Sequence, residues 1–302
     1  MFRHIYLLFY AGVLLSLNLF NGGQIPLEWQ VGIALSAILL VGIPHGAIDH
    51  IIYIRLRRVT QLEFYMPYLL LLFANVGLWL WQPGLGFALF VVLSAYHFGQ
   101  SQFYYVIGAP KFSRAIIELC WGLSLLLALL VYRHQEVIQT YLQPTELREV
   151  ADYLPLNYLT AGLLLCSAVS LTGLLYWYFT RQLNLNQLLS EVFVFALIHL
   201  SFYLLPALIS FTLYFVLIHS VGTLREEVAF LKDLNNSIGW RGVFLRFLPL
   251  TAISLLGLTG LMLMSHYQLL PYSITFILFA LIAGLTLPHT FVMTLFYSAR
   301  GK

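Results

Sequence analysis

Long stretches of hydrophobic residues follow one another along this chain and are separated by short polar segments. Most of these stretches approach the roughly 20 residues that an α-helix needs to cross a bilayer. The breaks contain proline and glycine, as at residues 82–84 and 108–111, or clustered charges. The predicted membrane spans cover residues 4–20, 30–53, 64–82, 84–107, 114–132, 158–180, 187–204, 206–222, 246–264 and 271–297. For residues 187–222, the alternative to two spans is a single broken or re-entrant element.

Composition supports this pattern and excludes a water-soluble domain. Charged residues make up 9% of the chain, whereas a soluble domain carries roughly 25%. No polar linker divides the sequence, so we predict a single all-α integral-membrane domain over residues 1–302. Its few basic residues form no patch that would bind nucleic acid, and no obligate protein partner is evident. Cys120 and Cys166 lie in apolar stretches, which excludes a disulfide framework.

The basic residues test the span count independently. With ten spans and a cytoplasmic N-terminus, Arg133 and Arg148 lie in outer loops, and the other thirteen of the fifteen basic residues lie on the inner side. This excess is what the positive-inside rule requires. We therefore predict a multi-pass protein of the inner (plasma) membrane with both termini cytoplasmic. The alternative for the first stretch is a signal peptide with Arg3 as its basic region, although no convincing cleavage site follows it.

Four histidines fall at one depth in this topology. Ionisable side chains inside a membrane are costly and commonly mark function. His45, His97, His219 and His289 lie in the second, fourth, eighth and tenth spans, which all run from outside to inside, and each lies at or beyond the midpoint. We interpret these four as ligands of one metal ion, because imidazole suits iron, zinc, copper and nickel. His199 lies on a span that runs the other way, and we expect it to hydrogen-bond a neighbouring helix instead.

The sequence around His45 adds further chemistry. Pro44 removes a backbone hydrogen bond and kinks a helix, and the glycines on either side permit a close approach of other groups. Asp49 follows His45 by four residues, so the two share one face if the helix continues, and the carboxylate would then accept the second N–H of the imidazole. His50 points away from that face, and we expect it to lie beside the site without binding the ion.

The charge of such an ion calls for nearby carboxylates, because four neutral imidazoles compensate none of it. Glu118 and Glu191 lie near the cytoplasmic ends of the fifth and seventh spans and are the candidates. The alternative is that each side chain extends to the membrane interface.

Four motifs occur in order along the chain: GIPHGAID at residues 42–49, HFG at 97–99, YFVLIHS at 214–220 and PH at 288–289. Together they resemble the motifs of the Brp/Blh family of bacterial and archaeal β-carotene 15,15′-dioxygenases. The resemblance implies an all-helical membrane enzyme that binds Fe(II) and cleaves the central double bond of β-carotene with O2. The products would be two molecules of retinal.

The resemblance also implies that His45, His97 and His219 are iron ligands. Many members of the family have a further ligand histidine four residues after the one that matches His219, and here that position is Thr223. A threonine hydroxyl is a poor iron ligand but could hydrogen-bond a bound water. His289 lies at matching depth in another family motif, and we predict it to be the fourth ligand.

Other classes of membrane protein fit the sequence less well. A di-iron desaturase needs dense histidine clusters such as H-x-x-x-H, which do not occur. A haem b protein needs histidines paired across facing helices and would leave two of the four without a role. A transporter with broken helices usually shows a repeat between its halves, and two Pro-His pairs are too short to establish one. Aromatic residues, 16% of the chain, could line a tunnel for a C40 polyene, although ordinary packing explains most of them.

Overall fold

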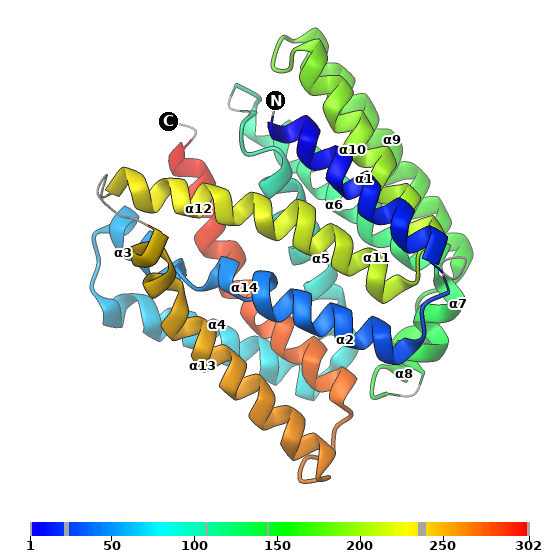
Figure 1. Cartoon of the computed structure of the whole chain (residues 1–302), viewed down its shortest axis with the longest axis vertical. Helices are drawn as coiled ribbons and strands as arrows, with labels where there is room; N and C mark the ends of the chain where they lie inside the picture. The colour runs from blue at the N-terminus through cyan, green and yellow to red at the C-terminus, as the bar shows by residue number, and fades with distance from the viewer. Residues whose placement is uncertain (1, 21–23, 107, 144, 235–239, 301–302) are drawn as a thin grey trace.

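The described residues form a helical bundle, and the computed structural model describes every residue except 1, 21–23, 107, 144, 235–239 and 301–302 (Figure 1). No strand occurs among them. Each of the ten predicted spans is largely helical in its described residues, although the second is interrupted between Gly46 and Asp49, and the predicted fold class is confirmed. The longer elements are α1 (Phe2–Leu19), α2 (Leu27–Ala37), α3 (Asp49–Arg57), α4 (Gln61–Trp81), α5 (Pro83–Gln102), α6 (Lys111–Tyr132), α9 (Leu156–Phe179), α10 (Leu185–Leu204), α11 (Ala207–Leu213), α12 (Val221–Leu234), α13 (Trp240–His266) and α14 (Ile274–Arg300). The short elements are π-helical η2 (Ile38–Gly42), 3-10 helical η3 (Pro44–Gly46), α7 (His134–Glu136), π-helical η4 (Val137–Leu142), α8 (Arg148–Asp152) and π-helical η5 (Tyr214–Ser220).

Eight of the described helical segments are long and apolar enough to cross a membrane. They include Leu185–Leu204 and Ala207–Asp233 as separate segments, divided at Pro206. The region with two possible interpretations therefore forms two helices. The second of them, which runs through α11, η5 and α12, extends well beyond the predicted end at residue 222.

Local signals explain where several helices begin. Thr60 and Glu63 form a capping box at the start of α4, and Asn184 and Gln187 form another at the start of α10. Each box satisfies backbone N–H groups that have no partner in the first helical turn. Proline lies at or next to the first residue of α2, α5, α6, α9 and α11, where its missing N–H costs nothing.

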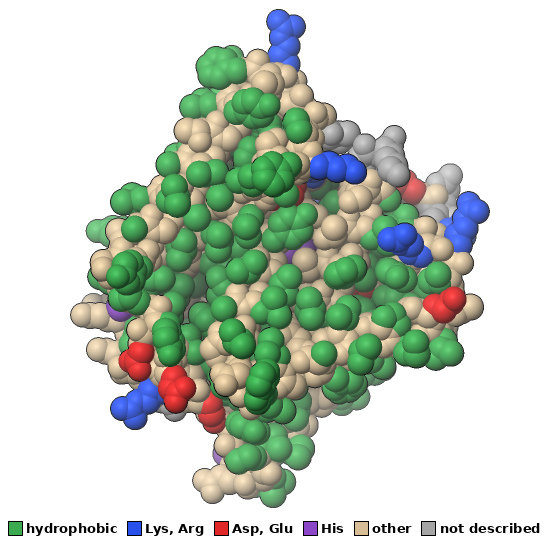
Figure 2. Space-filling view, turned by 180° about the vertical axis from the view of Figure 1, so that it is seen from behind, with side chains coloured by type: hydrophobic (Ala, Val, Ile, Leu, Met, Phe, Trp, Pro, Cys, Tyr) green, Lys and Arg blue, Asp and Glu red, His purple; other side chains and the backbone are tan. Residues whose placement is uncertain are grey.

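The surface of the bundle is that of a membrane protein. Figure 2 shows hydrophobic side chains across the middle of one face, while most charged side chains gather toward two opposite edges. Helix α13 lies on the outside of the bundle (Figure 1), and only 6% of its most apolar 18-residue stretch is buried. A helix that is apolar all round and exposed in this way is suited to contact with lipid.

Helices α5 and α6 approach each other more closely than any side chain would allow. A Cβ atom added to Gly99 would lie 1.8 Å from the carbonyl oxygen of Glu118, and one added to Gly122 would lie 1.8 Å from that of Ala95. The two glycines therefore let the backbones touch, as small residues do in membrane helix pairs. This contact fixes the segment of α5 that carries His97.

Candidate metal centre

The four histidines of similar predicted depth come together in the core. His45 lies on η3, His97 on α5, His219 on η5 and His289 on α14, and all four are buried. The direction of the predicted helices indicates this convergence, and in the structure each ring contacts two of the others.

The four rings form a closed cycle. His45 contacts His219 at 5.2 Å between ring centroids, His219 contacts His97 at 4.8 Å, His97 contacts His289 at 4.9 Å, and His289 contacts His45 at 5.0 Å. Neighbouring rings are nearly perpendicular, at 81° to 87°. Three of the histidines, at positions 45, 97 and 289, each offer a nitrogen within 4.8 Å of the others, close enough to share one ion.

Polar neighbours fix two of the rings through Nδ1. The Nδ1 atom of His45 bonds the carbonyl oxygen of Gly42, and the Nδ1 atom of His219 lies 3.0 Å from the hydroxyl of Ser101. The Gly42 carbonyl can accept this bond because the backbone leaves α-helical geometry here. The N–H of Gly46, which would bond that carbonyl in an α-helix, bonds the carbonyl of Ile43 instead, at 3.3 Å. The irregular turn at Pro44 thus orients the ring of His45.

Asp49 orients His289, and this corrects the prediction that it would pair with His45. The Nδ1 atom of His289 lies 2.9 Å from Oδ2 and 3.0 Å from Oδ1 of the carboxylate. The Tyr68 hydroxyl donates to Oδ2 as well, at 3.1 Å. The prediction required a continuous helix from His45, but η3 ends at Gly46 and α3 begins only at Asp49. The carboxylate therefore turns toward α14.

The nitrogen atoms that remain fit a metal ion. The Nε2 atoms of His219 and His289 are buried and have no hydrogen-bond partner among the described residues, and the same is true of both ring nitrogens of His97. An unpaired buried nitrogen is costly, whereas a metal ion would use these lone pairs. With Nδ1 held by an outer partner, the free Nε2 is the usual metal-binding atom of an imidazole.

Aromatic rings cover one side of the cluster. Phe215 stacks on His219 at 5.4 Å and 27°, and meets His45 edge-on at 5.8 Å. Phe98 contacts His219 from another side at 4.8 Å. Gly42 makes room for this wall, since a Cβ atom there would lie 2.8 Å from Phe215 Cε1. Phe215 and His219 both lie in η5, and π-helical turns occur frequently at functional sites.

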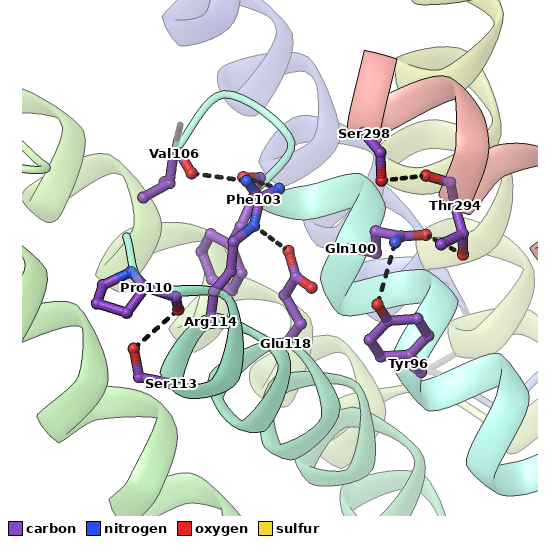
Figure 3. A network of polar contacts seen from close by, with 10 residues as sticks. All are labelled: Tyr96, Gln100, Phe103, Val106, Pro110, Ser113, Arg114, Glu118, Thr294 and Ser298. Atoms are coloured by element: carbon purple, nitrogen blue, oxygen red, sulfur yellow. Dashed lines mark hydrogen bonds and ion pairs between the residues drawn. The ribbon is translucent and has the colours of Figure 1, made fainter. Parts of the chain in front are cut away.

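The other predicted carboxylates have different partners. Glu118 is buried and forms an ion pair with Arg114 at 2.7 Å; Figure 3 shows this pair beside the loop that follows α5. Glu191 accepts hydrogen bonds from Gln102 at 2.6 Å and from the Tyr105 hydroxyl at 2.5 Å. Both side chains are buried, so neither extends to the interface as the alternative required. Arg114 already pairs with the charge of Glu118, and the predicted role of Glu118 near the histidines stays a prediction.

His50 and Thr223 also have structural partners. His50 stacks on Tyr65 at 6.1 Å and lies near Phe64, outside the cycle of four rings. It directly follows Asp49 in the chain, and its predicted place beside the metal site stays a prediction. The hydroxyl of Thr223 donates to the carbonyl oxygen of His219 at 3.0 Å. Thr223 thus touches the backbone of a candidate ligand and takes no place in the cycle.

His199 lies apart from the centre, as predicted. Its ring packs against Phe195 at 4.1 Å, and its Nδ1 atom lies 3.4 Å from the hydroxyl of Tyr132 on the neighbouring helix α6. The expected hydrogen bond to another helix is confirmed.

Sequence analysis missed one buried acid. Glu227 on α12 is completely buried, and neither of its carboxylate oxygens has a hydrogen-bond partner among the described residues. It follows His219 and Thr223 at intervals of four residues, so all three face the core from one side of the helix. The spacing was visible in the sequence, but the predicted span ended at residue 222.

Comparison with known proteins gives one result. The family model described as "Beta-carotene 15,15'-dioxygenase" matches residues 36–297, a range that contains all four histidines. No curated protein and no solved structure matches the chain.

Proposed function

Because the chain belongs to the β-carotene 15,15′-dioxygenase family, we propose that it uses Fe(II) and O2 to cleave the central double bond of β-carotene into two molecules of retinal. The family match identifies a carotenoid-cleaving enzyme. The metal, the oxidant and the roles of individual residues are the proposed part. The observation that supports them is the buried cycle of four imidazoles, in which His97, His219 and His289 have unpaired nitrogens.

His45, His97, His219 and His289 would hold the iron through the nitrogens that the outer partners leave free. Asp49 keeps the proton of His289 on Nδ1, because a carboxylate accepts only from an N–H, and this leaves Nε2 as the lone-pair atom. Iron(II), when bound, supplies the one-electron chemistry that ground-state O2 needs to react with an alkene.

The overall reaction makes modest demands on the remaining side chains. One O2 and one polyene give two aldehydes: the central double bond breaks, each of its carbons gains one oxygen atom, and no proton or electron enters or leaves. The site therefore needs no general acid or base. It must position an apolar chain and exclude water, and the ring of Phe215 beside His45 and His219 supports such a surface.

We also propose that the protein spans the plasma membrane with both termini in the cytoplasm. The excess of basic residues in the predicted inner loops supports this orientation. A β-carotene molecule dissolves in the bilayer and would reach the bundle from there.

Expression in β-carotene-producing bacteria, together with metal analysis of the purified protein, tests the proposal. We expect loss of the yellow pigment, accumulation of retinal, and one non-haem iron ion per chain. Purification with haem or without any metal would contradict the iron centre. Persistent colour in cells that contain folded, iron-loaded protein would contradict the substrate.

A further inference from the structure

The charge of the proposed centre is not balanced by its direct neighbours. Four neutral imidazoles leave the full charge of a divalent ion, and Asp49 contributes one negative charge through His289. Glu118 is already paired with Arg114 and therefore leaves no free negative charge for the centre. An uncompensated charge in a low-dielectric interior is strongly unfavourable. A second buried anion would make the centre neutral.

Glu227 is positioned to be that anion. Its side chain has no solvent exposure, and neither oxygen has a hydrogen-bond partner among the described residues. Leu231, one turn further along α12, packs in one hydrophobic cluster with Ile48 and Ile52, which lie on either side of Asp49. The carboxylates of Glu227 and Asp49 lie close enough to interact electrostatically. Tyr297, which hydrogen-bonds Thr223, lies within electrostatic range of it as well. Glu227 therefore lies near two residues that contact candidate ligands. Asp49 hydrogen-bonds the ring of His289, and Thr223 hydrogen-bonds the backbone carbonyl of His219.

An isolated pair of buried carboxylates would repel each other, so their proximity needs a cause. We propose that Glu227 supplies the second negative charge of the metal centre, so that a divalent cation, Asp49 and Glu227 together form a neutral unit inside the membrane. Glu227 is a positioning residue in this assignment, since it acts on the ion through its charge and not by direct ligation. This inference rests on metal binding in the proposed function, and it identifies Glu227 as a residue that strengthens that binding.

The test is Fe(II) binding by the purified full-length protein under anaerobic conditions, measured by competition with a chelator. The Glu227→Gln variant keeps the size of the side chain and removes its charge. We expect its Fe(II) affinity to fall roughly 10- to 100-fold, the range known for outer partners of metal ligands. Glu227→Asp keeps the charge and should bind within about threefold of the wild type.

Glu226→Gln is the matched control. Glu226 is the preceding residue of the same helix, is partly exposed, and accepts a hydrogen bond from the Tyr104 hydroxyl at 2.9 Å. Its loss of charge should leave Fe(II) affinity unchanged. Thermal unfolding of the metal-free proteins separates folding from binding, and metal-free Glu227→Gln should be at least as stable as the wild type because a buried charge without a partner is removed.

Each result has a definite meaning. Equal Fe(II) affinity in Glu227→Gln and the wild type would overturn the assignment and indicate a neutral, protonated carboxyl group. If Glu227→Gln does not fold, Glu227→Asp decides alone, and a tenfold or greater loss of affinity in that variant would overturn it. Failure of the wild type to bind Fe(II) would instead refute the proposed function, so the two failures are distinguishable.

Discussion

The Nδ1 atom of His289 lies 2.9 Å from the carboxylate of Asp49, although the two residues are 240 positions apart in the chain. This contact joins the first residue of α3 to the last helix. It also selects the tautomer of His289, leaving Nε2 free inside the cluster.

Replacing Asp49 by Asn should therefore weaken metal binding and leave the shape of the site intact. The amide can still accept one hydrogen bond, but it brings no charge. We expect Fe(II) affinity to fall roughly 10- to 100-fold, as measured by chelator competition. Unchanged affinity would show that Asp49 serves only the packing of α3 against α14.

His289→Ala distinguishes our fourth ligand from a packing residue. The variant should lose Fe(II) affinity by at least the roughly 100-fold that marks the upper end for outer partners, and retinal formation should disappear with it. His199→Ala is the control, because that ring packs against Phe195 away from the cycle, and the variant should keep iron occupancy nearly intact. Full occupancy and activity in His289→Ala would show that the assignment is wrong.

Metal removal should destabilise the protein. A ligand that binds only the folded state adds about 2.7 kcal/mol when its concentration is 100 times its Kd. Treatment with a strong chelator should lower the midpoint of thermal unfolding in detergent, and added Fe(II) should restore it. The same treatment should have no effect on a variant that lacks His97. A midpoint that does not respond to the chelator would argue against a structural contribution from the ion.

Gly42→Ala should disturb the aromatic wall. The new Cβ atom would lie 2.8 Å from Phe215 Cε1, so the ring must move from its place against His219. Overpacking of this kind costs about 1–3 kcal/mol, which thermal unfolding can measure. Adding Phe215→Leu should recover part of the loss by vacating the space. No recovery in the double variant would mean that the damage arises in the turn itself.

Gly99→Ala should be more damaging, because backbone atoms cannot give way as a ring can. The new methyl group would lie 1.8 Å from the carbonyl oxygen of Glu118, and we expect a cost at or above the upper end of about 3 kcal/mol. Gly84→Ala, on the same helix with nothing within 4 Å, should leave the unfolding midpoint unchanged. Equal midpoints for the two variants would contradict the close approach of α5 and α6.

Much of the fold and the convergence of the four histidines could be predicted because both depend on position along the membrane normal. Hydropathy places the helices, charge sets their direction, and direction gives the depth of His45 and its three partners. Pairing of side chains depends on helix rotation and on breaks in the backbone, which hydropathy does not report. Asp49 was assigned to the wrong histidine for that reason.

Glu227 was missed for a similar reason. The segment Arg225-Glu226-Glu227 has the polarity of a loop, so the predicted span ended before it. In the structure α12 continues to Leu234 and turns Glu227 inward while Glu226 stays partly exposed. The burial of a charged side chain on a helical face conflicts with the hydropathy pattern of the sequence, and only the tertiary environment explains it.

The reciprocal glycine contacts between α5 and α6 would limit how the proposed centre adapts to ions of different radius. Because the two backbones touch at both glycines, α5 cannot slide or rotate without carrying α6 with it. His97 is consequently the histidine of the cycle whose backbone has the least freedom to move. His45 can change its position more easily. Its irregular turn of π- and 3-10 geometry can change its dihedral angles with less disruption of repeating hydrogen bonds.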